Sequence, residues 1–106
     1  MQKLVIAFVH AEDAAPVADA LRDAGARFTR IPSLGGFLGE ENMTFVLAVD
    51  EDDLETIVGV FGRAAQGREV EVPLVLLDRL AEWEARTVHH AGATILVADL
   101  DRLIRT

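Results

Sequence analysis

The chain has 106 residues, of which 51% are hydrophobic and 26% are charged. This length supports one globular domain and excludes two, so we assign residues 1–106 to a single domain. The sequence contains no cysteine, which excludes disulfide bonds, a thiol nucleophile and a cysteine zinc site. The apolar runs are far shorter than the ~20 residues of a membrane span, and no signal-like segment precedes them, so we expect a cytoplasmic protein.

The formal net charge of −8 disfavours nucleic acids and anionic membranes as partners, because proteins that bind them usually present a basic stripe. The charge is distributed unevenly. Ala26–Gly39 contains Arg27 and Arg30 and no acid, whereas Glu40–Glu55 contains seven acids and no base. A locally cationic segment in an acidic chain is suited to a small anion, although chance clustering would give the same pattern.

The first part of the chain predicts a strand, a helix and a second strand. Lys3–His10 is a continuous apolar run typical of a buried strand. Asp13 is a candidate N-cap, Pro16 falls in the first helical turn, and Gly25 stands where a glycine often ends a helix. Ala26–Ile31 then returns to an extended pattern.

The same order of elements then repeats after a glycine-rich loop, Pro32–Asn42. Met43–Val49 is a second apolar strand, and the acidic run Asp50–Asp53 favours the start of a helix. Gly67 can end this helix, and Glu69–Leu77 predicts a further strand. The apolar stripe of the helix consists of Leu54, Ile57, Val58 and Phe61.

Two strand–helix–strand units that begin about 40 residues apart predict an α+β fold of the ferredoxin-like split βαβ type. In this fold an antiparallel sheet carries two helices on one face. The remaining segments predict a short helix over Asp78–Thr87, a fifth strand over Ala93–Ala98 and a closing turn over Leu100–Ile104. The second face of such a sheet is left apolar, so we expect an oligomer that buries it.

No sequence pattern indicates catalysis, so we predict a protein that is not an enzyme and has no cofactor. His89 and His90 would point to opposite faces of a strand, so we interpret them as exposed loop residues rather than metal ligands. Trp83 fits a helix-anchoring core position better than a stacking platform. Asp50–Asp53 lacks the alternate spacing and the glycine of a calcium loop.

The loop is the segment that best fits a ligand site. The paired glycines Gly35 and Gly36 allow backbone N–H groups to approach a ligand. Phe37 and Leu38 directly after them are unusual for a loop that faces water. Either they contact a ligand, or the loop packs its own phenylalanine beneath itself; the residues alone leave both interpretations open.

Polar side chains flank this loop on both sides. Arg27 and Thr29 share one face of the preceding strand because side chains alternate along a strand. Asn42 and Thr44 offer donors and acceptors on the other side. A guanidinium, hydroxyls, a carboxamide and free amides beside an aromatic ring suit a ligand with a phosphate and a base.

In these segments the sequence resembles the cyclic-di-AMP receptor branch of the PII-like signalling proteins. The resemblance lies in Arg27-x-Thr29, Gly35-Gly36-Phe37-Leu38 and Asn42-x-Thr44-Phe45. It implies a homotrimer whose three clefts between subunits bind the nucleotide, with help from the neighbouring subunit's C-terminal end. It also implies a sensor without catalysis, in which the ligand orders loops that engage a protein target. The pocket residues that it implies are Arg27, Thr29, Gly36, Phe37, Leu38 and Asn42.

Three residues depart from this family's pattern, namely Leu34, Glu41 and Ala48, and the segment Val70–His90 does not follow it. These departures leave the nucleotide open. A PII-like protein that binds ATP, ADP or another small anion is one alternative. A ferredoxin-like trimer of the metal-tolerance type, with His89 or His90 as ligand, is another.

Overall fold

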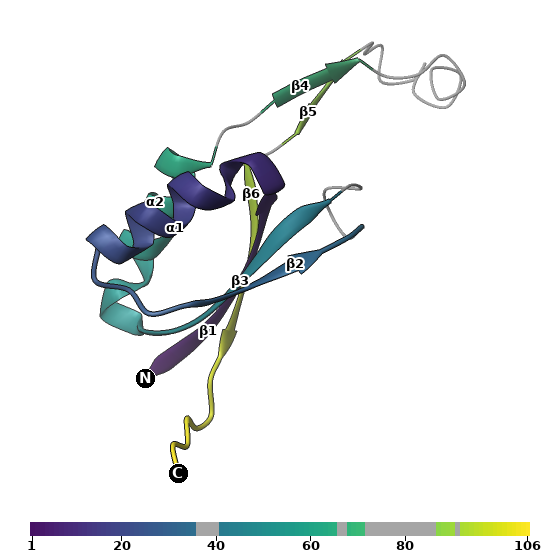
Figure 1. Ribbon diagram of the computed structural model, residues 1–106. Coiled ribbons are helices and arrows are strands. Elements are labelled where there is room, and N and C mark those ends of the chain that lie inside the picture. Colours follow the sequence, from purple (N-terminus) through teal and green to yellow (C-terminus); the bar gives the residue numbers. More distant parts are fainter. Residues whose placement is uncertain (36–40, 66–67, 72–86, 91) are drawn as a thin grey trace, which may run out of the picture.

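A computed structural model describes residues 1–35, 41–65, 68–71, 87–90 and 92–106 (Figure 1). In this part of the chain a four-stranded antiparallel sheet has the strand order β2-β3-β1-β6, and two helices lie on one of its faces. This is the predicted split βαβ arrangement. The elements are β1 (Gln2–His10), α1 (Ala14–Asp23), β2 (Thr29–Ser33), β3 (Asn42–Asp50), α2 (Leu54–Ala64), β4 (Arg68–Glu71), β5 (Thr87–His90) and β6 (Ala93–Asp99).

The hydrophobic core lies between the sheet and the two helices. β1 pairs with β3 from Gln2 opposite Asp50 to His10 opposite Asn42, so odd-numbered residues of both strands share one face. Phe45 packs edge-on against Phe61 of α2, with ring centroids 5.8 Å apart. The buried core residues of the two strands are Val5, Ala7, Val9, Phe45, Leu47 and Val49.

Helix α1 ends as predicted, at a glycine in the left-handed region. Gly25 has a φ of 76°. Its N–H donates to the Arg22 carbonyl and the Ala26 N–H donates to the Leu21 carbonyl, each at 2.9 Å, which is the Schellman pattern of helix termination. The predicted N-cap is wrong in one respect: Asp13 precedes the helix but closes a 3₁₀ turn, and its side chain makes no capping hydrogen bond.

Two element boundaries differ from the prediction. β2 spans Thr29–Ser33 rather than Ala26–Ile31, so Pro32 lies inside a strand. The proline is tolerated because β2 is an edge strand, where a missing N–H need not interrupt a ladder. α2 ends at Ala64, since Ala65 is already extended, and Gly67 lies outside the described residues.

The second half of the chain differs most from the prediction. Glu69–Leu77 was expected in the main sheet, but its described residues belong to β4, which pairs with β5 in a separate two-stranded sheet. The fourth strand of the main sheet is β6, within which the predicted strand Ala93–Ala98 lies. The alternation in Glu69-Val70-Glu71 is a local signal of a strand and does not specify the partner of that strand.

Smaller differences concern the residues around β5 and after β6. Thr87 begins a strand rather than ending a helix, and the other residues of the predicted helix, Trp83 among them, lie outside the described residues. His89 and His90 lie in β5 rather than in a loop. Leu100–Ile104 has no regular secondary structure instead of a turn.

An ion pair joins the central strand β1 to the edge strand β6. Lys3 donates to the carboxylate of Asp99, the residue opposite it in the register. This hydrogen bond holds the pKa of Asp99 below its ordinary value and raises the pKa of Lys3. None of the helices in the described ranges is long and apolar enough to cross a membrane.

Replacement of Gly25 tests the importance of the α1 terminus. A Cβ at Gly25 meets no atom within 4 Å, so Gly25→Ala introduces backbone strain without a clash. We expect a loss of about 1–2 kcal/mol in the free energy of unfolding by urea denaturation. Gly62→Ala in α2 is the matched control, because Gly62 also has open space around it but has helical geometry. It should gain up to about 1 kcal/mol; equal effects would contradict the argument.

Candidate ligand-binding site

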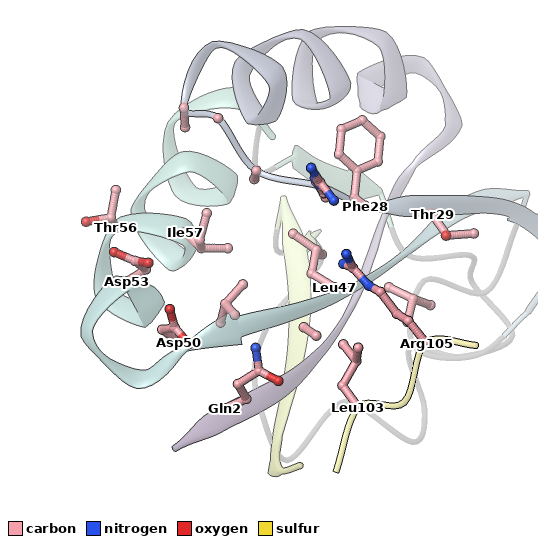
Figure 2. Close-up of a pocket in the computed structure, with 17 residues that line it drawn as sticks. Gln2, Phe28, Thr29, Leu47, Asp50, Asp53, Thr56, Ile57, Leu103 and Arg105 are labelled. Atoms are coloured by element: carbon pink, nitrogen blue, oxygen red, sulfur yellow. The ribbon is translucent and has the colours of Figure 1, made fainter. Parts of the chain in front are cut away.

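A cleft of about 530 Å³ opens where the segment before β2 diverges from the end of β3 (Figure 2). Its walls come from Ala24–Thr29, from Val46–Asp50 and from the start of α2. Gln2 from β1 and two residues after β6, Leu103 and Arg105, complete the lining. The Schellman turn at Gly25 forms part of the first wall.

The structure brings Arg27 and Thr29 together in this cleft, as their spacing predicts. Both side chains are exposed. Thr29 pairs with Val46, and this register places its side chain on the sheet face opposite the helices. Ala48, one of the three departures from the family pattern, lines the same cleft. That these residues bind a ligand stays a prediction.

The charged groups of the cleft are segregated. Asp50 and Asp53 lie beside α2, and Arg105 lies on the side of Thr29 with its side chain directed into the cleft (Figure 2). Within the described ranges, the carboxylates of Asp50 and Asp53 and the guanidinium groups of Arg27 and Arg105 form no ion pair. The cleft therefore contains two guanidinium groups that form no ion pair with carboxylates of the described residues.

A second polar cluster lies at the loop end of the β2–β3 pair. The Asn42 side chain is buried and donates to the Gly35 carbonyl at 2.9 Å. The Ser33 hydroxyl donates to the Asn42 side-chain oxygen and lies 2.7 Å from the Thr44 hydroxyl. Gly35 itself has a φ of 73°, in the region that favours glycine. The cluster thus brings together three predicted site residues, Gly35, Asn42 and Thr44.

The two groups of predicted residues lie at opposite ends of β2. Thr29 and Ser33 are four residues apart, or ~13 Å along a strand. Both side chains share the face opposite the helices, because their partners Val46 and Asn42 do. The predicted Gly36, Phe37 and Leu38 lie outside the described residues. Of the other departures, Glu41 is exposed beside Asn42, and Leu34 is 76% exposed.

Sequence reasoning missed several residues of the cleft, chiefly Gln2, Leu103 and Arg105. They come from the two ends of the described chain, which the antiparallel pairing of β1 and β6 brings together. No motif joins them, although an arginine in the segment after β6 was a weak signal. In the described part of the chain, no three histidine, aspartate or glutamate residues gather into a group that could hold a metal ion.

Comparison with known proteins identifies the family. A family model described as cyclic-di-AMP receptor matches residues 2–106. The chain belongs to this receptor family. The resemblance stated from the sequence is therefore confirmed, and the matched range includes Val70–His90, the segment that departs from the expected pattern. No curated protein matches the sequence.

Two solved structures share the fold of this chain. A functionally unknown protein from Pediococcus pentosaceus is 30% identical with a TM-score of 0.73, over 99% of this chain and 97% of that one. PII of Arabidopsis thaliana, bound to citrate, is 16% identical with a TM-score of 0.67, over 98% of this chain and 79% of that one. The predicted PII-like fold class is thereby confirmed.

Asn42 is expected to stabilise the base of the loop. Asn42→Ala removes its hydrogen bonds with the Gly35 carbonyl and the Ser33 hydroxyl, so urea denaturation should show a loss of about 1–3 kcal/mol. Thr44→Val is the matched control, because it removes one contact with Ser33 and preserves the shape of the side chain. We expect its loss to be smaller. Equal losses of stability in the two variants would contradict a particular role of Asn42 at the base of the loop.

Proposed function

We propose that the protein is a signalling receptor that binds cyclic-di-AMP and catalyses no reaction. Membership of the receptor family supports the ligand. The observation that carries the proposal for this chain is the guanidinium of Arg27, which lines a cleft of about 530 Å³ and forms no ion pair within the described residues. A phosphate is the natural counter-ion for such a group, because guanidinium–phosphate hydrogen bonds are charge-assisted.

The cleft and the loop cluster would each contact a different part of the ligand. Arg27 and the Thr29 hydroxyl would hold a phosphate, and the strand residue Ala48 would lie against a base. Gly36, Phe37 and Leu38 would cover the ligand from the loop, and Asn42 with Thr44 would hold the base of that loop. Support for this division comes from the shared orientation of Thr29, Asn42 and Thr44 toward the sheet face that the helices leave open.

The receptor would act as a homotrimer. The face of the sheet opposite the helices carries apolar side chains from all four strands, and Ile31 and Leu96 are 48% and 44% exposed in a single chain. Three copies that pack these faces together would bury this surface and place a cleft at each subunit boundary. The apolar residues of this face are Leu4, Ile6, Phe8, Ile31, Val46, Ala48, Leu96 and Ala98.

Signal relay would follow from the loop. Asn42, the first residue of β3, donates a hydrogen bond from its side chain to the Gly35 carbonyl. A ligand that contacts the loop would therefore act on a segment that is hydrogen-bonded to the sheet. Ordering of the loop on binding would present a new surface to a protein target. The ligand would thus control recognition of the target.

The trimer is tested by mass. Light scattering should give three times the 11.5 kDa of one chain. Leu96→Glu places a charge on the open sheet face and should lower this mass, because a charge buried without a partner is unfavourable. The control Ala15→Glu adds the same charge on an exposed position of α1 and should leave the trimer intact. A parent mass near one chain would exclude the trimer.

The ligand is tested by calorimetric titration with cyclic-di-AMP, ATP, ADP and cyclic-di-GMP. Arg27→Ala should weaken the binding of cyclic-di-AMP roughly tenfold to a hundredfold, the equivalent of about 1.5–3 kcal/mol for a charge-assisted contact. Arg30→Ala is the matched control, since Arg30 pairs with Phe45 on the other face of β2 and does not line the cleft. Its affinity should match that of the parent.

The titration also separates the alternatives. Tighter binding of ATP or ADP than of cyclic-di-AMP would assign the site to an adenine nucleotide of another kind. A parent that binds none of the four nucleotides, or an Arg27→Ala variant as strong as the parent, would show that the proposed site is wrong.

A further inference from the structure

We propose that Phe28 is a positioning residue, which holds Arg27 in the place from which it binds the phosphate. This inference rests on the proposed function and extends it from the groups that touch the ligand to a group that supports them. Phe28 lies between Arg27 and Thr29 in the sequence, and all three residues line the cleft.

The backbone at Arg27 lacks the hydrogen-bonded support that its neighbours have. On one side, the Ala26 N–H donates to a carbonyl of α1 at 2.9 Å, in the Schellman turn. On the other side, Thr29 is the first residue of β2 and pairs with β3. Arg27 and Phe28 belong to no helix or strand in the described part of the chain. The place of the Arg27 guanidinium therefore depends on what anchors this short segment.

The ring of Phe28 provides that anchor. It is directed from the segment toward α1 (Figure 2) and packs against Phe45 of β3, with ring centroids 5.5 Å apart and an interplanar angle of 55°. Such tilted aromatic pairs stabilise a structure beyond the area that they bury. Phe45 is fully buried and packs in turn against Phe61 of α2. The core thus holds Phe28, and the backbone of Phe28 holds the adjacent Arg27.

A cation covers the same ring. The Arg22 guanidinium of α1 lies 5.5 Å from the centroid of the Phe28 ring, which is within the range of a cation–π contact. Arg22 also pairs with Asp19, at 3.2 Å, and it does not line the cleft. With Arg22 over the ring and Phe45 against it, Phe28 is better suited to anchor the segment than to stack on a base.

These contacts give Arg22 an indirect role in binding. A guanidinium that must first be ordered binds a phosphate less tightly, in proportion to the fraction of molecules in which it is already in place. Loss of the Phe28 ring lowers that fraction, and loss of Arg22 loosens the ring. Arg22 would therefore affect the affinity for cyclic-di-AMP although it lies outside the cleft.

Calorimetric titration with cyclic-di-AMP tests the anchor. Phe28→Leu keeps an apolar side chain but removes the ring, and it should weaken binding about tenfold, or ~1.4 kcal/mol. Phe28→Tyr keeps the ring and should retain nearly the parent's affinity. Arg22→Ala should weaken binding about threefold, or ~0.7 kcal/mol, which is the scale of one exposed cation–π contact.

Two variants control for charge. Arg30→Ala removes an arginine that pairs with Phe45 on the helix side of β2 and does not line the cleft. Asp19→Asn removes the ion pair of Arg22 but leaves its contact with Phe28. Both variants should bind as tightly as the parent. If Arg30→Ala loses as much affinity as Arg22→Ala, the loss reflects net charge, and the inference is overturned.

A double-variant cycle distinguishes positioning from a general loss of stability. If Phe28 acts through Arg27, the combination of Phe28→Leu with Arg27→Ala should bind about as weakly as Arg27→Ala alone. Additive losses would contradict the inference. If Phe28→Leu does not fold, the same cycle is made with Arg22→Ala, whose side chain is exposed on α1.

The same titrations separate this inference from the proposed function. If Arg27→Ala loses affinity while Phe28→Leu and Arg22→Ala bind as tightly as the parent, the inference is wrong and the proposed function stands. If the parent binds none of the nucleotides, the proposed function fails and the inference fails with it.

Discussion

The antiparallel register between β1 and β3 determines which side chains enter the core and which face the candidate site. Paired residues have the same parity, so odd-numbered residues of both strands, such as Val5 and Leu47, pack under the helices. Even-numbered residues, such as Ile6 and Val46, lie on the open face. A slip of one residue would exchange the two sets and expose the core. β2 and β6 pair with the outer edges of β3 and β1, so the β1–β3 register also determines which of their side chains face the helices.

The same register distributes polar groups along the sheet. Asn42 lies at the loop end of β3 and Asp50 at the other end, where the cleft opens. A ligand site between them has a hydrogen-bonded loop base on one side and charged groups on the other. Between these ends, Phe45 packs edge-on against Phe61 of α2 and anchors the strand to the core. Loop and cleft are therefore positioned by one strand, which favours their use by one ligand.

The sequence predicts the order of the elements from β1 to α2 because their signals are local. Apolar runs, Gly25 and the acidic start of α2 each specify an element through neighbouring residues. The pairing of strands is not local: the alternation in Glu69-Val70-Glu71 correctly indicates a strand, yet β6 takes the place beside β1. The residues of the candidate site likewise include some that local sequence signals predict and some that only the pairing of strands brings to the cleft. Arg27 and Thr29 follow from a two-residue spacing, whereas Arg105 reaches the cleft only through the β1–β6 pairing.

The local arrangement of charge resolves an apparent conflict, since a chain with a net charge of −8 is proposed to bind an anion. At physiological ionic strength, exposed charges farther than ~8 Å from a ligand are largely screened. The ligand then responds mainly to groups within that distance. Around Arg27 and Arg105 these groups include guanidiniums that the chain's own carboxylates leave unpaired in the described residues. Asp50 and Asp53 line the same cleft beside α2, whereas the acids elsewhere on the surface act chiefly at long range, where salt weakens their effect. Higher salt therefore weakens repulsion from distant acids as well as attraction to the two arginines, so the net salt dependence of binding should be shallow.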